Sequence, residues 1–220
     1  NSSFTIYLVF LPKLTRGYRS MNYGVITRAK VAGDYRDQAI EAMKQWREIS
    51  LANGSQGVRL GVIQSGANVG ALIAFQFFEN MADIESAYDA LIEAPITKQT
   101  IESGKFNIFG RAIVKNLMKF GTTSEDAKYI VLTVGTANDP VVDAVTNFAG
   151  VLNANGCISG RYGQFVVGDN ANGKKFLFGA SYPSLSAMQS AYDAVAADGL
   201  AADLYKLVSV EKRQIVRLIK

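Results

Sequence analysis

The sequence contains no histidine and only one cysteine, Cys157. Without an imidazole, the chain cannot build a His-ligated haem, zinc or non-haem iron site, and it cannot use Ser-His or Cys-His catalysis. We therefore predict no metal site and no cofactor. A single cysteine also excludes an internal disulfide, which fits a reducing compartment and leads us to expect a cytoplasmic protein. The apolar sequence around Cys157 indicates a small buried residue rather than a nucleophile.

Long runs of one residue type are also missing. The apolar run near the N-terminus covers only residues 6–11, whereas a membrane span needs about 20 apolar residues. Basic residues follow this run, while a signal peptide would place them before it. The net charge of +4 comes mostly from residues 1–20, and no Lys/Arg-rich run occurs anywhere. We therefore expect neither membrane nor nucleic-acid partners.

What the chain does contain is a repeated pentapeptide. Ser-Ala-Tyr-Asp-Ala occupies residues 86–90 and returns unchanged at residues 190–194. Other landmarks recur around it in the same order, at offsets from 102 (Arg59 to Arg161) to 106 (Tyr23 to Tyr129). This regularity predicts a tandem duplication of a unit of about 100 residues, a common domain size.

Each unit has the hydrophobic periodicity of the same six main elements. In the first unit, alternating β-branched residues predict a strand, and apolar residues at three- and four-residue steps predict helices. The expected elements of that unit are strand 23–31, a helix capped by Asp34, strands 57–64 and 71–78 joined by a turn, a helix capped by Asn80, a short helical turn 97–103 and strand 106–117. This β-α-β-β-α-β order is the ferredoxin-like unit.

The second unit repeats this order after a small, polar linker. Its strand begins at Tyr129, its first helix opens at Asp139-Pro140, a hairpin turn covers residues 168–173, and Ser184 caps its second helix. We predict four segments: an N-terminal extension (1–20, an extra strand or disordered), a first repeat (21–119), a linker (120–127) and a second repeat (128–220).

Over residues 22–220, this duplicated order resembles the dimeric α/β-barrel superfamily, which includes antibiotic-biosynthesis-monooxygenase-like, EthD-like and stress-responsive barrel proteins. The resemblance implies an α+β fold in which two tandem ferredoxin-like repeats pack their antiparallel sheets face to face as an intramolecular barrel. It also implies a monomer that is a pseudo-dimer, or a homodimer of such monomers. A sheet covered by helices on one face leaves the other face bare, and a tethered second copy can cover it. The branches of the superfamily that rely on histidine cannot be represented here.

Repeated polar residues on apolar elements are the candidate ligand-binding residues. Tyr88 and Tyr192 lie on the sheet-facing side of their helices, where each phenol either faces a pocket or only packs its ring on the sheet. Arg59 and Arg161 precede matched glycines on the second strand of each unit. If they point between helix and sheet, they can bind a carboxylate or enolate; otherwise they pair with acids of the flanking helix.

Three further aromatic residues are candidates, each with a structural alternative. Trp46, the only tryptophan, either packs in the core or stacks on a flat ligand. Tyr23 and Tyr129 begin the first strand of each repeat and either line a pocket mouth or sit there because tyrosine is common in strands. The corresponding arginines of the last strands, Arg111 and Arg213, are interpreted as surface charges.

Two functional hypotheses remain open at this stage. The first is a small-molecule-binding or cofactor-independent, enzyme-like protein that acts on a small apolar carbonyl or phenolic compound. It predicts a pocket in which a tyrosine hydroxyl and an arginine converge. The second is a non-catalytic structural or interaction module in which duplication has replaced a homodimer.

Overall fold

The computed structural model of the protein describes residues 21–169 and 171–220, so the predicted extension 1–20 lies outside the described residues. The first repeat contains β1 (Tyr23–Val31), the 3-10 turn η1 (Gly33–Tyr35), α1 (Arg36–Ala52), β2 (Gly57–Ile63), β3 (Leu72–Phe78), α2 (Met81–Glu93), α3 (Pro95–Glu102) and β4 (Phe106–Gly121). The second contains β5 (Tyr129–Thr136), α4 (Val142–Ala154), β6 (Ser159–Val167), β7 (Lys175–Tyr182), α5 (Leu185–Asp198), α6 (Leu200–Leu207) and β8 (Ser209–Ile219).

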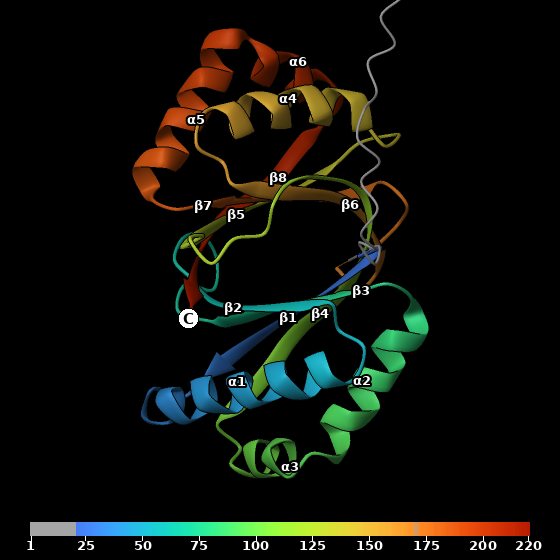
Figure 1. Ribbon diagram of the computed structural model, residues 1–220, viewed down its shortest axis with the longest axis vertical. Helices are drawn as coiled ribbons and strands as arrows, with labels where there is room; N and C mark the ends of the chain where they lie inside the picture. The colour runs from blue at the N-terminus through green and yellow to red at the C-terminus, as the bar shows by residue number, and fades with distance from the viewer. Residues whose placement is uncertain (1–20, 170) are drawn as a thin grey trace, which may run out of the picture.

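The strands form one closed antiparallel barrel in the order β1-β3-β2-β8-β5-β7-β6-β4. Each repeat contributes half of it, and the halves join where β2 pairs with β8 and where β4 pairs with β6. Helices α1–α3 cover one side of the barrel and α4–α6 the opposite side (Figure 1). The predicted α+β fold of two tandem ferredoxin-like repeats is confirmed, and closure leaves no unpaired sheet edge among these strands.

Local signals position the helices that flank the barrel. Asn80 and Ser184 cap α2 and α5 as predicted, since each side chain accepts a hydrogen bond from the backbone N–H three residues later. The predicted cap at Asp34 is wrong, because α1 begins only after η1 and the Asp34 carboxylate pairs with Lys105 instead. Helix α4 likewise begins at Val142, after Asp139-Pro140.

Side chains alternate between the two faces of each strand, so one set points into the barrel and the other set packs under the helices. On β2, Ile63 belongs to the interior cluster, whereas Leu60 packs with Ala39 and Met43 of α1. The interior cluster joins buried residues of both repeats: Ile26, Ile63, Ala71, Ile73, Phe75, Ala112, Val114, Ile130, Leu132, Val134, Phe165, Leu177 and Val216. The two repeats therefore share one core and fold as a unit.

Two matched glycines allow the halves of the barrel to meet. A Cβ atom on Gly61 of β2 would lie 2.9 Å from the carbonyl oxygen of Arg217 on β8, and one on Gly163 of β6 would lie 2.7 Å from that of Lys115 on β4. Such approaches are closer than side chains tolerate, so both seams depend on a residue without a side chain. This explains the glycine that follows Arg59 and Arg161 two positions later in the sequence.

The described residues contain neither a helix that could cross a membrane nor a cluster that could hold a metal ion. None of the described helices combines the length and apolar character that crossing a membrane requires. Within residues 21–169 and 171–220, no three side chains of His, Cys, Asp or Glu gather into a group that could hold a metal ion.

Candidate functional site

The first repeat contains a pocket of about 260 Å³ between its helices and its half of the barrel, which we call the helix–sheet pocket. The outer faces of β1, β2, β3 and β4 form its floor, and α1, α2 and α3 form its walls. Its apolar lining includes Met43, Leu60, Leu72, Ala74 and Phe106. An apolar pocket with a few polar groups is the usual form of a small-molecule site.

Four polar side chains converge on one wall of this pocket. The Tyr88 hydroxyl donates a 2.9 Å hydrogen bond to Gln76 Oε1 and lies 3.5 Å from Thr27 Oγ1. Arg111 Nε donates to the same Thr27 oxygen over 3.1 Å. The Arg111 guanidinium lies 4.4 Å from the centre of the Tyr88 ring, a cation–π contact. A phenol and a guanidinium thus meet at an apolar pocket, but the arginine is Arg111 rather than Arg59.

Trp46 forms part of the same wall and is held by its own hydrogen bond. Its indole Nε1 donates to Thr97 Oγ1 over 2.8 Å, and its ring meets Phe106 edge-on at 5.2 Å between centres. Gln76 is buried and donates through Nε2 to Ser50 Oγ over 2.8 Å. This chain of bonds from α1 to α2 fixes the positions of Gln76 and Tyr88.

The second repeat keeps three of these four polar side chains, with Ala180 in place of Gln76, but not the space. Arg213 Nε donates to Thr133 Oγ1 over 3.2 Å, and its guanidinium lies 5.2 Å from the Tyr192 ring centre. The pocket beside these residues measures only about 40 Å³. It is filled mainly by the aromatic side chains of Phe148, Tyr162, Phe176, Phe178 and Tyr205.

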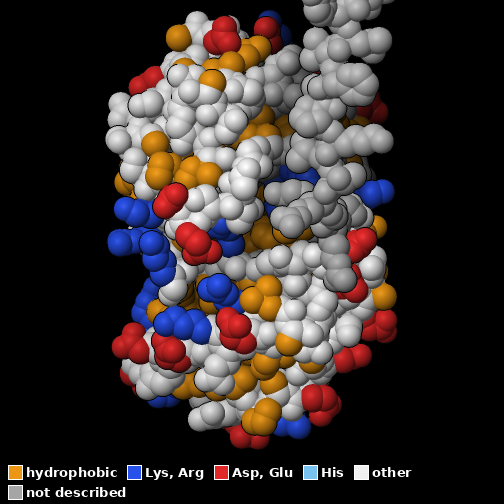
Figure 2. All heavy atoms as spheres, in the orientation of Figure 1, with side chains coloured by type: hydrophobic (Ala, Val, Ile, Leu, Met, Phe, Trp, Pro, Cys, Tyr) orange, Lys and Arg blue, Asp and Glu red, His pale blue; other side chains and the backbone are white. Residues whose placement is uncertain are grey.

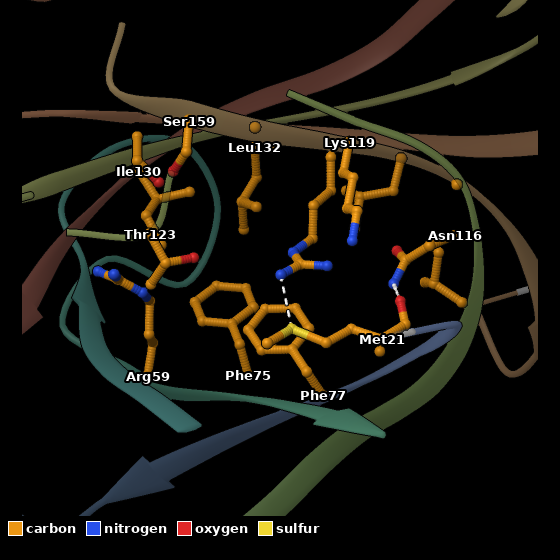
Figure 3. A pocket seen from close by; sticks show the side chains of 18 of the residues that line it. Met21, Arg59, Phe75, Phe77, Asn116, Lys119, Thr123, Ile130, Leu132 and Ser159 are labelled. Carbon is orange, nitrogen blue, oxygen red and sulfur yellow. Dashed lines mark hydrogen bonds between the residues drawn. The ribbon is translucent and has the colours of Figure 1, made fainter. Parts of the chain in front are cut away.

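A larger cavity of about 740 Å³ lies inside one end of the barrel, which we call the barrel cavity. Phe75, Phe77, Ile130 and Leu132 form much of its apolar lining. Figure 3 shows Phe75 and Phe77 on its floor, with Arg59 on one side and Lys119 on the other. Lys and Arg side chains also gather on the surface at the level of the barrel (Figure 2).

Arg59 and Arg161 both line the barrel cavity rather than the helix–sheet pockets. Sequence reasoning considered only the space under the helices and missed this cavity, because it forms only when two repeats close the barrel. Arg59 Nη2 donates to the Ser124 carbonyl over 3.0 Å. Arg161 packs on Phe77, with 4.3 Å from guanidinium carbon to ring centre. Burial, and next the charge of Arg59, lower the pKa of Arg161 to about 10.

The remaining candidates divide between the pocket and the core. Trp46 and Tyr88 line the helix–sheet pocket, and Tyr192 lines its small counterpart. Tyr23 packs against the apolar cluster of Val25 and Phe78 beneath α2, away from the cavities. Tyr129 pairs with Tyr182 and Arg217 on the neighbouring strands and lines none of these cavities. Arg111 corresponds to Arg213 of the second repeat, and this match could have identified Arg111 from the sequence. In the structure, Arg111 lies opposite Thr27 and Arg213 lies opposite Thr133 on the paired strands.

Comparison with known proteins gives one family and a set of distant structures. The family model described as "Domain of unknown function (DUF6854)" matches twice, at residues 21–116 and 127–218. No curated protein matches the chain. The similar solved structures share the fold at low sequence identity. They include a "putative monooxygenase" from Fusobacterium nucleatum subsp. nucleatum ATCC 25586 (11% identity, 90% of this chain and 93% of that chain covered, TM-score 0.70), a "putative monooxygenase" from Lactobacillus acidophilus NCFM (14%, 90% and 93%, 0.61) and a heme-binding protein from Thermus thermophilus (7%, 90% and 91%, 0.56).

The residues of this chain do not fit a haem in either helix–sheet pocket. The chain has no histidine, the proximal ligand of globins and peroxidases. Cys157 is buried and does not line either pocket. Aromatic side chains fill the second pocket, and the Tyr88 hydroxyl of the first is bound to Gln76.

Proposed function

For a chain that belongs to the family described as DUF6854 and has the dimeric α/β-barrel fold, we propose that the helix–sheet pocket of the first repeat binds a small, mainly apolar molecule with a carbonyl or phenol oxygen. One observation carries this proposal. The first repeat keeps about 260 Å³ open beside Tyr88 and Arg111, whereas the second repeat fills the equivalent space down to about 40 Å³. Open apolar space costs stability, so its retention in one repeat supports a ligand.

The polar wall suits an oxygen atom that carries partial negative charge. Arg111 uses Nε toward Thr27, so its terminal nitrogens can still donate to a ligand oxygen. The Tyr88 hydroxyl can donate to the same oxygen when it turns from Gln76. Among the described residues, the lining includes Arg47 and Arg111 but no aspartate or glutamate. Together these donors would stabilise charge that develops on a carbonyl or phenol oxygen.

We further propose that the protein acts on this compound as a cofactor-independent, enzyme-like protein. The absence of histidine leaves the tyrosine hydroxyl and the arginine as the groups that can polarise the ligand. Monooxygenase and heme-binding names among proteins of the same fold support small-molecule chemistry as the general class.

The alternative function, a non-catalytic structural module, has its support in the second repeat. There Arg213 contacts both Thr133 and Tyr192 beside a space of only about 40 Å³ with a mainly aromatic lining. In this alternative the matched residues of both repeats only preserve packing, and duplication has replaced a homodimer.

The fluorescence of Trp46 provides a direct test, because Trp46 is the single tryptophan of the sequence and lines the pocket. Titration with acetophenone and 4-methylphenol should give a saturable change in its emission. In Ala74→Phe, which places the aromatic residue of the second repeat into the first, this change should disappear. Tyr88→Phe should weaken binding about tenfold, the effect of one lost hydrogen bond, and the matched Tyr192→Phe should leave it unchanged. Equal titration of wild type and Ala74→Phe, or no saturable change in wild type, would refute the proposal.

A further inference from the structure

We propose that the barrel cavity is a second binding site, separate from the helix–sheet pocket, and that it takes an organic anion: a carboxylate on an apolar body, with the carboxylate held by Arg161. The inference does not depend on the proposed function, because the two sites lie on opposite faces of the sheet. It rests on a partly buried guanidinium with one unsatisfied nitrogen, on a lining without acids among the described residues, and on a large apolar volume.

The first observation is the Arg161 guanidinium itself. Its Nη1 atom is buried and has no hydrogen-bond partner among the residues that the structure describes. Its Nη2 atom reaches only the Met21 sulfur, at 2.8 Å, and a thioether is a weak acceptor. The dashed line to the sulfur in Figure 3 marks this contact. A buried cation without a strong acceptor is costly, so the arrangement favours an anion that supplies one.

The second observation is the charge of the cavity wall. Arg59, Lys119 and Arg161 line the cavity, and the described part of its lining contains no aspartate or glutamate. Asn116 and Ser159 also line the cavity, and the Asn116 amide donates to the Met21 carbonyl over 2.7 Å. Like charges that face one cavity raise each other's energy, and a bound carboxylate lowers it. The pKa of Arg161 is lowered to about 10, first by burial and next by the charge of Arg59.

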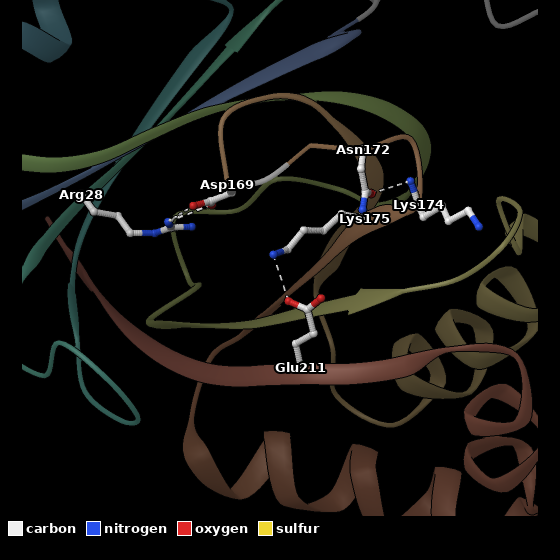
Figure 4. Close-up of polar contacts among 6 residues, drawn as sticks. All are labelled: Arg28, Asp169, Asn172, Lys174, Lys175 and Glu211. Atoms are coloured by element: carbon white, nitrogen blue, oxygen red, sulfur yellow. Dashed lines mark hydrogen bonds and ion pairs between the residues drawn. The ribbon is translucent and has the colours of Figure 1, made fainter.

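At the opposite end of the barrel, a buried arginine is paired with an acidic side chain of the protein itself. Arg28 of β1 is buried at 7% exposure, and its Nη1 contacts the Asp169 carboxylate at 2.9 Å. Lys175 pairs with Glu211 nearby at 3.0 Å, as Figure 4 shows. At that end the protein supplies the anion. At the end that contains Arg161, the cavity has room for one to enter.

The third observation is the apolar body of the cavity. Beyond the arginines, the wall is made of Phe75, Val114, Ile130, Leu132 and Leu177. A volume of about 740 Å³ exceeds what a carboxylate alone needs, and it falls in the range of sites that enclose whole small molecules. A free inorganic anion would leave this apolar wall unmatched. An amphipathic acid satisfies both parts of the site.

Isothermal titration of the full chain with decanoate tests the proposal, with 1-decanol as the uncharged probe of the same length. We expect saturable decanoate binding, and binding of 1-decanol at least tenfold weaker. Arg161→Met should weaken decanoate binding by ten- to a hundredfold, the range for a charge-assisted hydrogen bond. Arg217→Met removes an exposed arginine from β8 and should leave the affinity unchanged.

A stability measurement separates a binding role of Arg161 from a merely structural one. Without ligand, Arg161→Met should unfold at the same temperature as wild type or higher, because it removes a partly buried charge with one unsatisfied nitrogen, and methionine can still pack on Phe77. Decanoate should raise the unfolding temperature of wild type and not that of the variant. Three results would overturn the inference: no saturable binding of decanoate at millimolar concentration, equal affinity in wild type and Arg161→Met, or equal binding of 1-decanol. The fluorescence test of the helix–sheet pocket is unaffected by any of them.

Discussion

The two repeats differ less in their polar residues than in what surrounds them. Each has a threonine on its first strand, an arginine on its last and a tyrosine on its second helix, in the same contact pattern. The residues around them have diverged. By strand pairing, Ala74 corresponds to Phe178, Gln76 to Ala180 and Leu60 to Tyr162. Duplication thus preserved one polar frame and placed it beside an open pocket in one half and a filled one in the other.

This difference shows that the first repeat is the less tightly packed half of the molecule. In the second repeat, Phe178 stacks on Phe120 at 6.1 Å and meets Phe148 edge-on at 5.8 Å between ring centres. In the first repeat, Ala74 leaves that space open, and the buried Gln76 requires hydrogen bonds from both sides. Well-packed aromatic rings stabilise a fold, and a pocket does so only when filled.

The largest effect should come from opening the second pocket. Phe178→Ala removes the central ring between α4 and the sheet, and we expect a loss of about 3–5 kcal/mol in the free energy of unfolding. Urea unfolding followed by circular dichroism measures it. Phe109→Ala is the control, since Phe109 is 37% exposed on β4, and it should cost less than about 1 kcal/mol. Similar losses in both variants would contradict the view that Phe178 packs the second repeat.

Next in size is the loss of the buried amide in the first repeat. Gln76→Ala gives the first repeat the residue of the second and leaves Tyr88 and Ser50 without that partner. We expect a loss of about 1–3 kcal/mol in unfolding free energy, the cost of unmade buried hydrogen bonds. The control Gln56→Ala, whose amide makes only a long contact of 3.4 Å with Gly54, should change little. If Gln76→Ala has an unchanged unfolding free energy and an unchanged ligand titration, Gln76 does not contribute to the site.

The two stacked arginines should separate binding from stability. Arg111→Met and Arg213→Met each remove one cation–π contact, worth about 0.5–1 kcal/mol at exposed positions. Arg213→Met also removes the hydrogen bond from Nη2 to the Tyr205 hydroxyl at 2.8 Å, so its loss of stability should be the larger of the two. Only Arg111→Met should weaken the Trp46 fluorescence titration, because only its pocket is open. If Arg213→Met weakens that titration equally, the asymmetry between the repeats has no functional meaning.

Most of the fold could be predicted from the sequence, because each strand, helix and cap pattern occurs twice, once in each repeat. The order of strands and helices in each repeat, and the caps Asn80 and Ser184, are confirmed. The length of β4 was underestimated: it continues to Gly121 because its last residues pair with β6 of the other repeat. A long-range partner of this kind leaves no periodic trace within one repeat.

The site was harder to predict, because it depends on which face of a strand is hollow. Tyr88 and Trp46 were recognised from their helical faces, and both line the open pocket. Arg59 and Arg161 were predicted either to point between helix and sheet or to pair with acids of the flanking helix, whereas they line the barrel interior. Alternation along a strand distinguishes two faces but does not say which one contains a cavity, since that depends on side-chain volumes from several strands.

The smallest effect at neutral pH should come from Cys157, whose counterpart in the first repeat is Ser55. The Ser55 hydroxyl donates to the Gly57 carbonyl over 3.0 Å, and the Cys157 thiol lies 3.5 Å from the Ser159 carbonyl. Cys157→Ser should therefore change the unfolding free energy by less than about 1 kcal/mol near pH 7.

The comparison becomes sharper in alkali. Burial raises the pKa of the Cys157 thiol from 9.0 to about 11. Between these two values the unfolded chain has released the thiol proton and the folded protein still holds it. The wild type must therefore lose stability as the pH rises from about 9 to 11. Cys157→Ser has no proton to release and should not show this loss. Urea unfolding of both proteins across the interval tests it, and parallel pH profiles would mean that the thiol ionises in the folded protein as readily as in water.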